Sequence, residues 1–202
     1  MTGLGLRGVA FITGAGGALG RAMALQFARD GVRRIAGVDL SPQGLSDTAQ
    51  ALRTADPAVD FLPLAADISN EEQVATAFRS VIHRFGRVDY AVNNAAIAGP
   101  LGPTDTLAVD DLDRVQKINL RGTWLCEREE LKHMATQEPL QTEGDRVPSR
   151  GSIVVVSSLL GIRAMPQNSL YTISKHAILG LVRTDALDYA AKGIRINAVC
   201  PG

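Results

Sequence analysis

The sequence contains little cysteine and histidine, and neither residue type occurs in a metal-binding pattern. Cys126 and Cys200 are the two cysteines among 202 residues, and they lie far apart, without a Cys-x-x-Cys pair or a Cys/His cluster. His83, His133 and His176 also lack the spacing of metal ligands. We therefore expect no metal site, and we interpret the cysteines as buried thiols of a protein in a reducing compartment.

The chain also lacks an excess of charge of either sign and any long apolar run. Its formal net charge at pH 7 is zero and no cluster of lysine and arginine stands out, which argues against nucleic acid or an anionic membrane surface as a partner. Only Arg7 precedes the first apolar segment, so the N-terminus resembles neither a signal peptide nor a membrane anchor. We expect a cytoplasmic protein that acts on a small molecule.

Short apolar runs alternate with longer helical stretches along the whole chain, a pattern typical of repeated strand and helix. With 46% hydrophobic residues, residues 1–202 can form one domain. The predicted strands are 9–13, 34–38, 60–64, 88–93, 152–157 and 194–199, and the predicted helices are 20–30, 42–54, 70–85, 107–135 and 169–191. This order predicts an α/β fold, a Rossmann-type doubly wound parallel sheet of six strands with flanking helices. The polar, proline-containing residues 136–150 are expected to form a long surface loop.

A glycine-rich turn follows the first predicted strand directly. It reads Thr13-Gly14-Ala15-Gly16-Gly17-Ala18-Leu19-Gly20 and leads into a helix that begins near Arg21. Unpaired N–H groups and the positive end of the helix dipole make such a turn an anion site, which fits a dinucleotide pyrophosphate. Asp39 ends the second strand, 19 residues after Gly20, where an acid accepts hydrogen bonds from the adenosine ribose and repels a 2′-phosphate. We therefore expect NAD, with NADP as an alternative because Arg21 is close by.

The segment from Ser158 to Lys175 carries a hydroxyl, a phenol and an ammonium group. Tyr171 and Lys175 lie four residues apart, so both side chains would share one face of a helix. A cationic neighbour favours the ionised phenol, which makes Tyr171 a candidate acid/base. Ser157 is the rival of Ser158, although the spacing to Tyr171 favours Ser158.

Taken together, these motifs resemble those of the classical short-chain dehydrogenase/reductase family, and the resemblance runs from about Gly8 to Gly202. Asn119, Ser158, Tyr171 and Lys175 match the family's catalytic tetrad in order, and Asn93-Asn94-Ala95-Ala96 resembles its Asn-Asn-Ala-Gly segment. The resemblance implies an NAD(P)-dependent oxidoreductase that interconverts a secondary alcohol and a ketone. In it Tyr171 exchanges a proton with the substrate oxygen, Lys175 holds the nicotinamide ribose, Ser158 hydrogen-bonds the substrate oxygen, and Asn119 anchors a water-linked proton path.

The resemblance also implies a set of cofactor-binding residues. Asp67 would hold the adenine, with a turn cap as its alternative, and Asn119 could instead cap or kink its helix. The full set is Thr13, Gly14, Gly16, Gly17, Leu19, Gly20, Asp39, Asp67, Ile68, Asn93, Ala95, Tyr171, Lys175, Pro201 and Gly202.

The sequence departs from the family pattern in three ways. Ala18 and Ala96 replace family glycines, which matters where a position needs positive φ or close backbone approach. Asn119 and Ser158 lie 39 residues apart, about a dozen more than is typical of the family. Family members also usually continue for about fifty residues beyond the Pro-Gly pair, so the seventh, edge strand would be missing.

That third departure leaves alternatives to an active enzyme open. A truncated chain could bind the cofactor without turnover, or act as an interaction partner through its sheet edge. Independently of these alternatives, the chain could form a homo-oligomer. We expect the isolated chain to have marginal solubility and weak turnover, because strand 194–199 would expose an unpaired edge.

Overall fold

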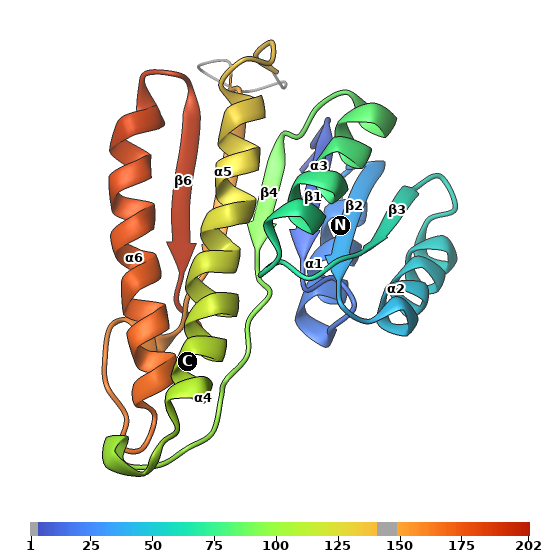
Figure 1. Ribbon diagram of the computed structural model, residues 1–202. Helices are drawn as coiled ribbons and strands as arrows, with labels where there is room; N and C mark the ends of the chain where they lie inside the picture. Colours follow the sequence, from blue (N-terminus) through green and yellow to red (C-terminus); the bar gives the residue numbers. More distant parts are fainter. Residues whose placement is uncertain (1–3, 141–148) are drawn as a thin grey trace.

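The computed structural model describes residues 4–140 and 149–202, and in this part of the chain six parallel strands form one sheet (Figure 1). The strand order is β3-β2-β1-β4-β5-β6, so β1 and β4 meet where the order reverses. That switch point is where doubly wound sheets bind ligands, at the carboxyl ends of the strands. The predicted fold class is confirmed. The strands are β1 (Val9–Thr13), β2 (Arg34–Asp39), β3 (Asp60–Ala65), β4 (Tyr90–Asn93), β5 (Gly151–Val156) and β6 (Ile194–Val199).

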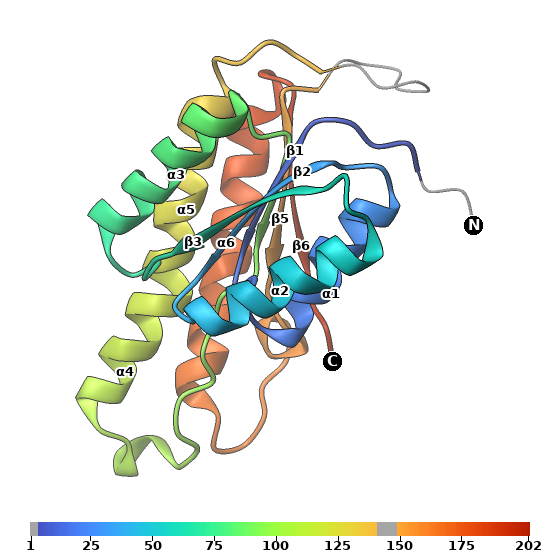
Figure 2. The same ribbon diagram turned by 90° about the vertical axis from the view of Figure 1, so that its right-hand side faces the viewer.

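Helices cover the sheet on both faces (Figure 2). α1 (Ala18–Arg29) and α2 (Pro42–Ala55) pack on one face, while α3 (Glu71–Phe85), α5 (Thr123–Met134) and α6 (Ser169–Ala190) pack on the other. The split follows the side-chain alternation of β1, because Val9 and Phe11 join the core under α3, α5 and α6, whereas Ala10 and Ile12 join the core under α1 and α2. Both faces of β1 are therefore buried, as expected of a strand inside a parallel sheet.

Local signals in the sequence explain where several helices begin and end. The Asn70 side chain accepts a hydrogen bond from the Gln73 N–H and caps α3, whose first turn carries Glu71 and Glu72. Gly86 ends the same helix with a φ of 78°, a conformation that favours glycine. Ser41 caps α2 in the same way as Asn70 caps α3, by accepting from the N–H of Gly44.

The predicted helix 107–135 is wrong as one continuous element. The structure contains α4 (Val109–Gln116), then a π-helical turn η2 (Lys117–Gly122), then α5. The chain stays helical through η2, which directly follows α4 and directly precedes α5, but its wider turns make i→i+5 hydrogen bonds. Such π turns are rare and occur mostly at functional sites, and η2 contains Asn119.

The predicted loop at 136–150 lies partly outside the described residues, since 141–148 are not described. On either side of that stretch, Leu140 and Ser149 pair as an isolated antiparallel bridge. In the described residues 4–140 and 149–202 no helix is long and apolar enough to cross a membrane.

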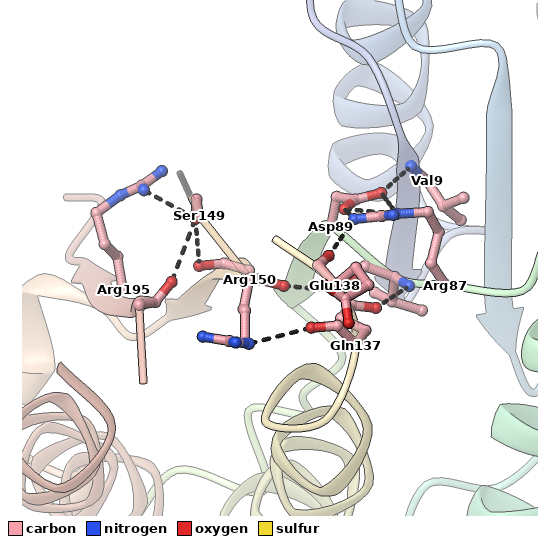
Figure 3. A network of polar contacts seen from close by, with 11 residues as sticks. Val9, Arg87, Asp89, Gln137, Glu138, Ser149, Arg150 and Arg195 are labelled. Carbon is pink, nitrogen blue, oxygen red and sulfur yellow. Dashed lines mark hydrogen bonds and ion pairs between the residues drawn. The ribbon is translucent and has the colours of Figure 1, made fainter. Parts of the chain in front are cut away.

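A polar network holds together the ends of the strands opposite the carboxyl ends (Figure 3). Asp89, which is 4% exposed, accepts from the Val9 N–H at 2.8 Å and from the Arg87 guanidinium at 2.7–3.0 Å. The Gln137 side chain donates to the carbonyls of Val88 and Arg150. The network therefore ties β1, the start of β4 and the segment before β5 into one unit.

Candidate active site

The glycine-rich turn between β1 and α1 has almost no space for side chains. Gly14 has a φ of 70°, and a Cβ on Gly20 would lie 2.1 Å from the Gly14 carbonyl oxygen. The first turn of α1 contains no acidic residue and no capping side chain, so its N–H groups can receive an anion. Ala18 opens the helix and Ala96 follows β4, and neither has positive φ, so the two departures from the family pattern create no backbone strain.

Asp39 lies at the end of β2 and faces this turn. One carboxylate oxygen accepts from the Gly16 N–H and the other from the Ser41 N–H, both at 2.9 Å. Arg21 turns to other partners, the Gly16 carbonyl and Thr48 Oγ1. The negative group thus sits at the rim of the pocket, where it would meet a ribose.

A pocket of about 360 Å³ opens over the carboxyl ends of β1, β2 and β4. Eight predicted cofactor residues line it, namely Gly14, Gly17, Leu19, Gly20, Asp39, Asp67, Ile68 and Ala95. Sequence reasoning missed further lining residues, and each adjoins a motif or a strand end: Ala18, Val38, Leu40, Ala66, Asn94, Ala96, Ile97 and Ile118. The pocket is therefore lined by the motif residues and by their mostly apolar neighbours in the sequence.

Three predicted cofactor residues lie behind the pocket wall and shape it. Thr13 is buried, and its Oγ1 accepts from the N–H groups of Asn94 and Ala95 at 3.0 and 3.1 Å. Gly16 binds Asp39, as described above. Asn93 is also buried and donates to Glu130 Oε2 at 3.0 Å. The Thr13 contacts join β1 to the segment after β4, the Gly16 contact joins the glycine-rich turn to β2, and the Asn93 contact joins β4 to α5.

Asp67 combines the two roles that the sequence left open. Its Oδ1 accepts from the Ser69 N–H at 2.8 Å, which forms a turn before α3. It also lines the pocket next to Ile68, which is buried. A turn cap and a pocket wall are therefore compatible at this residue.

The π turn holds Asn119 in a fully buried position. Asn119 Oδ1 accepts from the Ile97 N–H at 2.9 Å, and its Nδ2 donates to the Ile97 carbonyl at 2.8 Å and to Ser174 Oγ at 3.1 Å. Ser174 in turn donates to the Tyr171 carbonyl at 2.8 Å. Asn119 thus connects the segment after β4 with the first turns of α6.

The two serines after β5 differ in what they contact. Ser157 is buried and donates to the Lys175 carbonyl at 3.0 Å, whereas Ser158 is partly exposed and accepts from the Leu160 N–H at 3.1 Å. Ser157 therefore connects β5 to α6, while the Ser158 hydroxyl hydrogen remains available.

Tyr171 and Lys175 share one face of α6, as predicted. Lys175 is 2% exposed, its Nζ donates to the Val156 carbonyl at 2.7 Å, and the same Nζ lies 5.4 Å from the centre of the Tyr171 ring. Burial lowers the pKa of Lys175 to about 8, and the nearby Cys200 opposes this shift. Pro201 accepts from the Leu159 N–H at 2.6 Å, which places the chain beside the Ser158 loop, and Gly202 lies near the Leu159 side chain.

Two buried acids near the site had no signal in the sequence. Glu127 and Glu130 lie one helical turn apart on α5 and are 1% and 0% exposed. Burial raises the pKa of Glu127 to about 8, with a smaller contribution from Asp185, and burial and Glu127 raise the pKa of Glu130. With a pKa of about 8, Glu127 is largely a protonated acid at neutral pH.

Comparison with known proteins places these features in context. A family model described as short chain dehydrogenase matches residues 8–202. A levodione reductase of Leifsonia aquatica is 38% identical over 96% of this chain and 68% of the relative. A 2-(R)-hydroxypropyl-CoM dehydrogenase of Xanthobacter autotrophicus is 39% identical over 96% of this chain and 73% of the relative.

Solved structures agree with the sequence relatives. A levodione reductase structure superposes with a TM-score of 0.88 at 38% identity, covering 96% of this chain and 71% of that chain. An NAD+-bound xylitol dehydrogenase superposes with a TM-score of 0.88 at 33% identity, covering 96% and 70%.

Proposed function

The chain belongs to the short-chain dehydrogenase family, and from this premise we propose how its residues interconvert a secondary alcohol and a ketone with a nicotinamide cofactor. The protein is an NAD(P)-dependent oxidoreductase. The observation that carries the residue assignment is the buried Lys175 ammonium beside Tyr171, at the carboxyl end of β5. When bound, the nicotinamide supplies or accepts the hydride at the carbinol carbon.

In the proposed reaction, Tyr171 exchanges the proton with the substrate oxygen. The Lys175 ammonium lies beside the Tyr171 ring, and Ser158 offers a hydrogen bond to the substrate oxygen. We assign this role to Ser158 rather than Ser157, because the Ser157 hydroxyl already donates its hydrogen bond to the Lys175 carbonyl. Asn119 keeps its proposed place on a proton path, since it hydrogen-bonds both the segment after β4 and Ser174.

The pocket supports NAD as the preferred cofactor. Gly14, the residues from Gly17 to Gly20 and Asp39 line it together with Asp67 and Ile68, which form the wall that we assign to the adenine. A second negative charge from a 2′-phosphate beside the Asp39 carboxylate would be repelled.

The preference for NAD is tested by titrating both cofactors against the wild-type chain and Asp39→Ala. We expect the wild type to bind NAD at least about tenfold more tightly than NADP, because one unfavourable charge contact costs about 1.4 kcal/mol or more. Asp39→Ala should bring the two affinities closer together, because it removes the charge that repels the 2′-phosphate of NADP. Equal affinities in the wild type, or a ratio unchanged by the substitution, would contradict the placement of Asp39 at the ribose.

The reaction itself is tested with NADH that carries deuterium at C4 and a panel of prochiral ketones. We expect deuterium at the carbinol carbon of the product, because the hydride moves directly between cofactor and substrate. Transfer of label to water alone, or binding of NADH without oxidation of it by any ketone in the panel, would contradict the proposal. The relatives include a levodione reductase and a 3beta-hydroxysteroid dehydrogenase, so the panel covers cyclic diketones, steroids and small ketones.

We also propose a cytoplasmic location. Cys126 and Cys200 are free thiols, which supports a reducing compartment. The zero net charge supports a small-molecule substrate rather than nucleic acid. Self-association of the chain remains a prediction, which sedimentation would test.

A further inference from the structure

One arginine connects the wall of the cofactor pocket to the turn that carries Asn119. Arg121 lies in η2, two residues after Asn119, and its Nη1 donates to the Ser69 carbonyl at 2.6 Å. Its Nη2 lies 3.8 Å from a carboxylate oxygen of Glu71, at the start of α3. Ser69 directly follows Asp67 and Ile68, so the guanidinium holds the outer side of the wall that we assign to the adenine.

Close packing makes this connection stiff. Gly122 lies against Ile68, and a Cβ on Gly122 would be 2.9 Å from Ile68 Cδ1 and 3.2 Å from the Ile68 carbonyl oxygen. Ile118, from the same π turn, lines the pocket directly. Because neither has space to slide past the other, we expect a displacement of the segment 67–69 to displace the turn η2 as well.

The other end of η2 reaches the proposed catalytic residues. Asn119 is held by the Ile97 backbone and by Ser174, which is bonded to the carbonyl of Tyr171. A displacement of η2 would thus change the position of Asn119 relative to the start of α6.

We propose that Arg121 is a positioning residue that couples occupancy of the adenosine end of the pocket to the placement of Asn119. The inference rests on the proposed function and adds to it a route by which a part of the cofactor remote from the chemistry contributes to turnover. Such use of remote binding energy raises kcat as well as affinity.

Arg128 provides a matched control. It also binds Glu71, with Nη2 2.7 Å from a carboxylate oxygen, but it lies on α5 and makes no recorded contact with Ser69. Arg128→Gln therefore removes a cation from the same acid and leaves the link between Ser69 and η2 intact.

The test measures backbone hydrogen exchange of residues 117–122 with and without ADP, a ligand that carries only the adenosine half of the cofactor. In the wild type we expect ADP to slow exchange there by about tenfold, a typical size for coupling between sites. Arg121→Gln should reduce this protection to about twofold, Arg121→Lys should restore part of it because lysine can still donate to the Ser69 carbonyl, and Arg128→Gln should keep it. In turnover, Arg121→Gln should lower kcat and raise the KM for NAD, each by about fivefold.

Different outcomes separate this inference from the proposed function. If ADP and NAD bind Arg121→Gln and the wild type alike, with equal protection at η2 and equal kcat, the positioning role is overturned while the oxidoreductase assignment stands. If the wild type binds neither ligand, both are overturned. Thermal unfolding of each variant shows whether it is folded. If Arg121→Gln does not fold, the protection of residues 117–122 and the kcat of Arg121→Lys decide the positioning role instead.

Discussion

At the scale of single residues, the two acids on α5 are the most unusual feature near the site. No cation is recorded as a partner of Glu127 or Glu130 in the described part of the chain, and three of their four carboxyl oxygens have no hydrogen-bond partner there. A carboxylate in such surroundings is costly, so each group takes up a proton instead. The pKa of Glu127 is accordingly raised to about 8.

Glu127→Gln should therefore change how stability depends on pH. Below pH 4.5 the acid is protonated in both the folded and the unfolded chain, and wild type and variant should be of similar stability. Between pH 4.5 and 8 the unfolded wild type loses its proton while the folded chain keeps it, so the free energy of unfolding of the wild type falls with rising pH.

Glutamine does not titrate, so by pH 8 the variant should gain up to roughly 4–5 kcal/mol in free energy of unfolding over the wild type. This is an upper estimate, at about 1.4 kcal/mol for each pH unit between the usual pKa of 4.5 and the raised pKa of about 8. Urea unfolding at pH 4.5, 6 and 8 measures this, with Glu72→Gln on the exposed first turn of α3 as the surface control. Parallel curves for wild type and Glu127→Gln would show that Glu127 is ionised in the folded chain.

Residue identities in the site could be predicted from the sequence, but residue contacts could not. Spacing pointed to Ser158 and Tyr171, whereas the hydrogen bond that takes Ser157 out of consideration depends on how α6 packs beside β5. The same limit applies to Glu127 and Glu130. Acids on a helix normally face solvent, and only the assembled layers show these two facing inward.

At the scale of elements, the glycine-rich turn specifies the start of α1 by excluding side chains. Gly17 and Gly20 lie in the same turn but differ in their surroundings. A Cβ on Gly17 would be 3.5 Å from the nearest atom, the Gly14 carbonyl oxygen, at a φ of −79° that suits any residue. A Cβ on Gly20 would collide with that oxygen at 2.1 Å.

We therefore expect Gly20→Ala to cost about 3 kcal/mol in free energy of unfolding, since the clash is with backbone and cannot be relieved by a rotamer change. Gly17→Ala should change stability by less than about 1 kcal/mol. Chemical denaturation of both variants is the measurement. If Gly20→Ala lost as little stability as Gly17→Ala, the turn would be able to shift away from the added methyl group, and its close packing would not fix the start of α1.

The break between α4 and α5 shows where prediction of elements from sequence ends. The apolar period over 107–135 correctly indicates helix on both sides. No proline marks the break, and a single glycine, Gly122, does not by itself distinguish a π turn from an α-helical one. In the widened turn η2, Asn119 bonds to Ile97 and Ser174, while Arg121 and Gly122 contact the segment 67–69. Those partners are set by tertiary contacts, which a periodicity does not contain.

At the scale of the whole molecule, the carboxyl ends and the amino ends of the strands differ in what they contain. The carboxyl ends carry the pocket, which is lined by apolar side chains, glycines and a few short polar groups, and the opposite ends carry the network around Asp89 (Figure 3). β6 forms one edge of the sheet and pairs with β5 alone among the described residues, as the sequence led us to expect. We therefore expect the network around Asp89 to contribute to stability without contributing to cofactor binding.

Asp89→Asn tests this division. The substitution leaves Arg87, which is only about one quarter exposed, without its ion pair and weakens the bond to the Val9 N–H, so we expect a loss of about 2–3 kcal/mol in free energy of unfolding. The control is Asp60→Asn, which removes the exposed pair with Arg84 and should cost less than about 1 kcal/mol. Similar small losses for both would show that the network adds little to the sheet. NAD affinity of the folded variants should be unchanged, because the network lies at the far end of the strands.

The central claim, that one site joins the nucleotide pocket to Tyr171, is tested most directly by measuring NAD affinity and turnover together for Tyr171→Phe. Phenylalanine keeps the ring and removes the acid/base, so we predict a dissociation constant for NAD within about threefold of the wild type and turnover reduced at least about 100-fold, the usual contribution of general acid–base catalysis. Turnover of Tyr171→Phe near the wild-type rate would contradict the account.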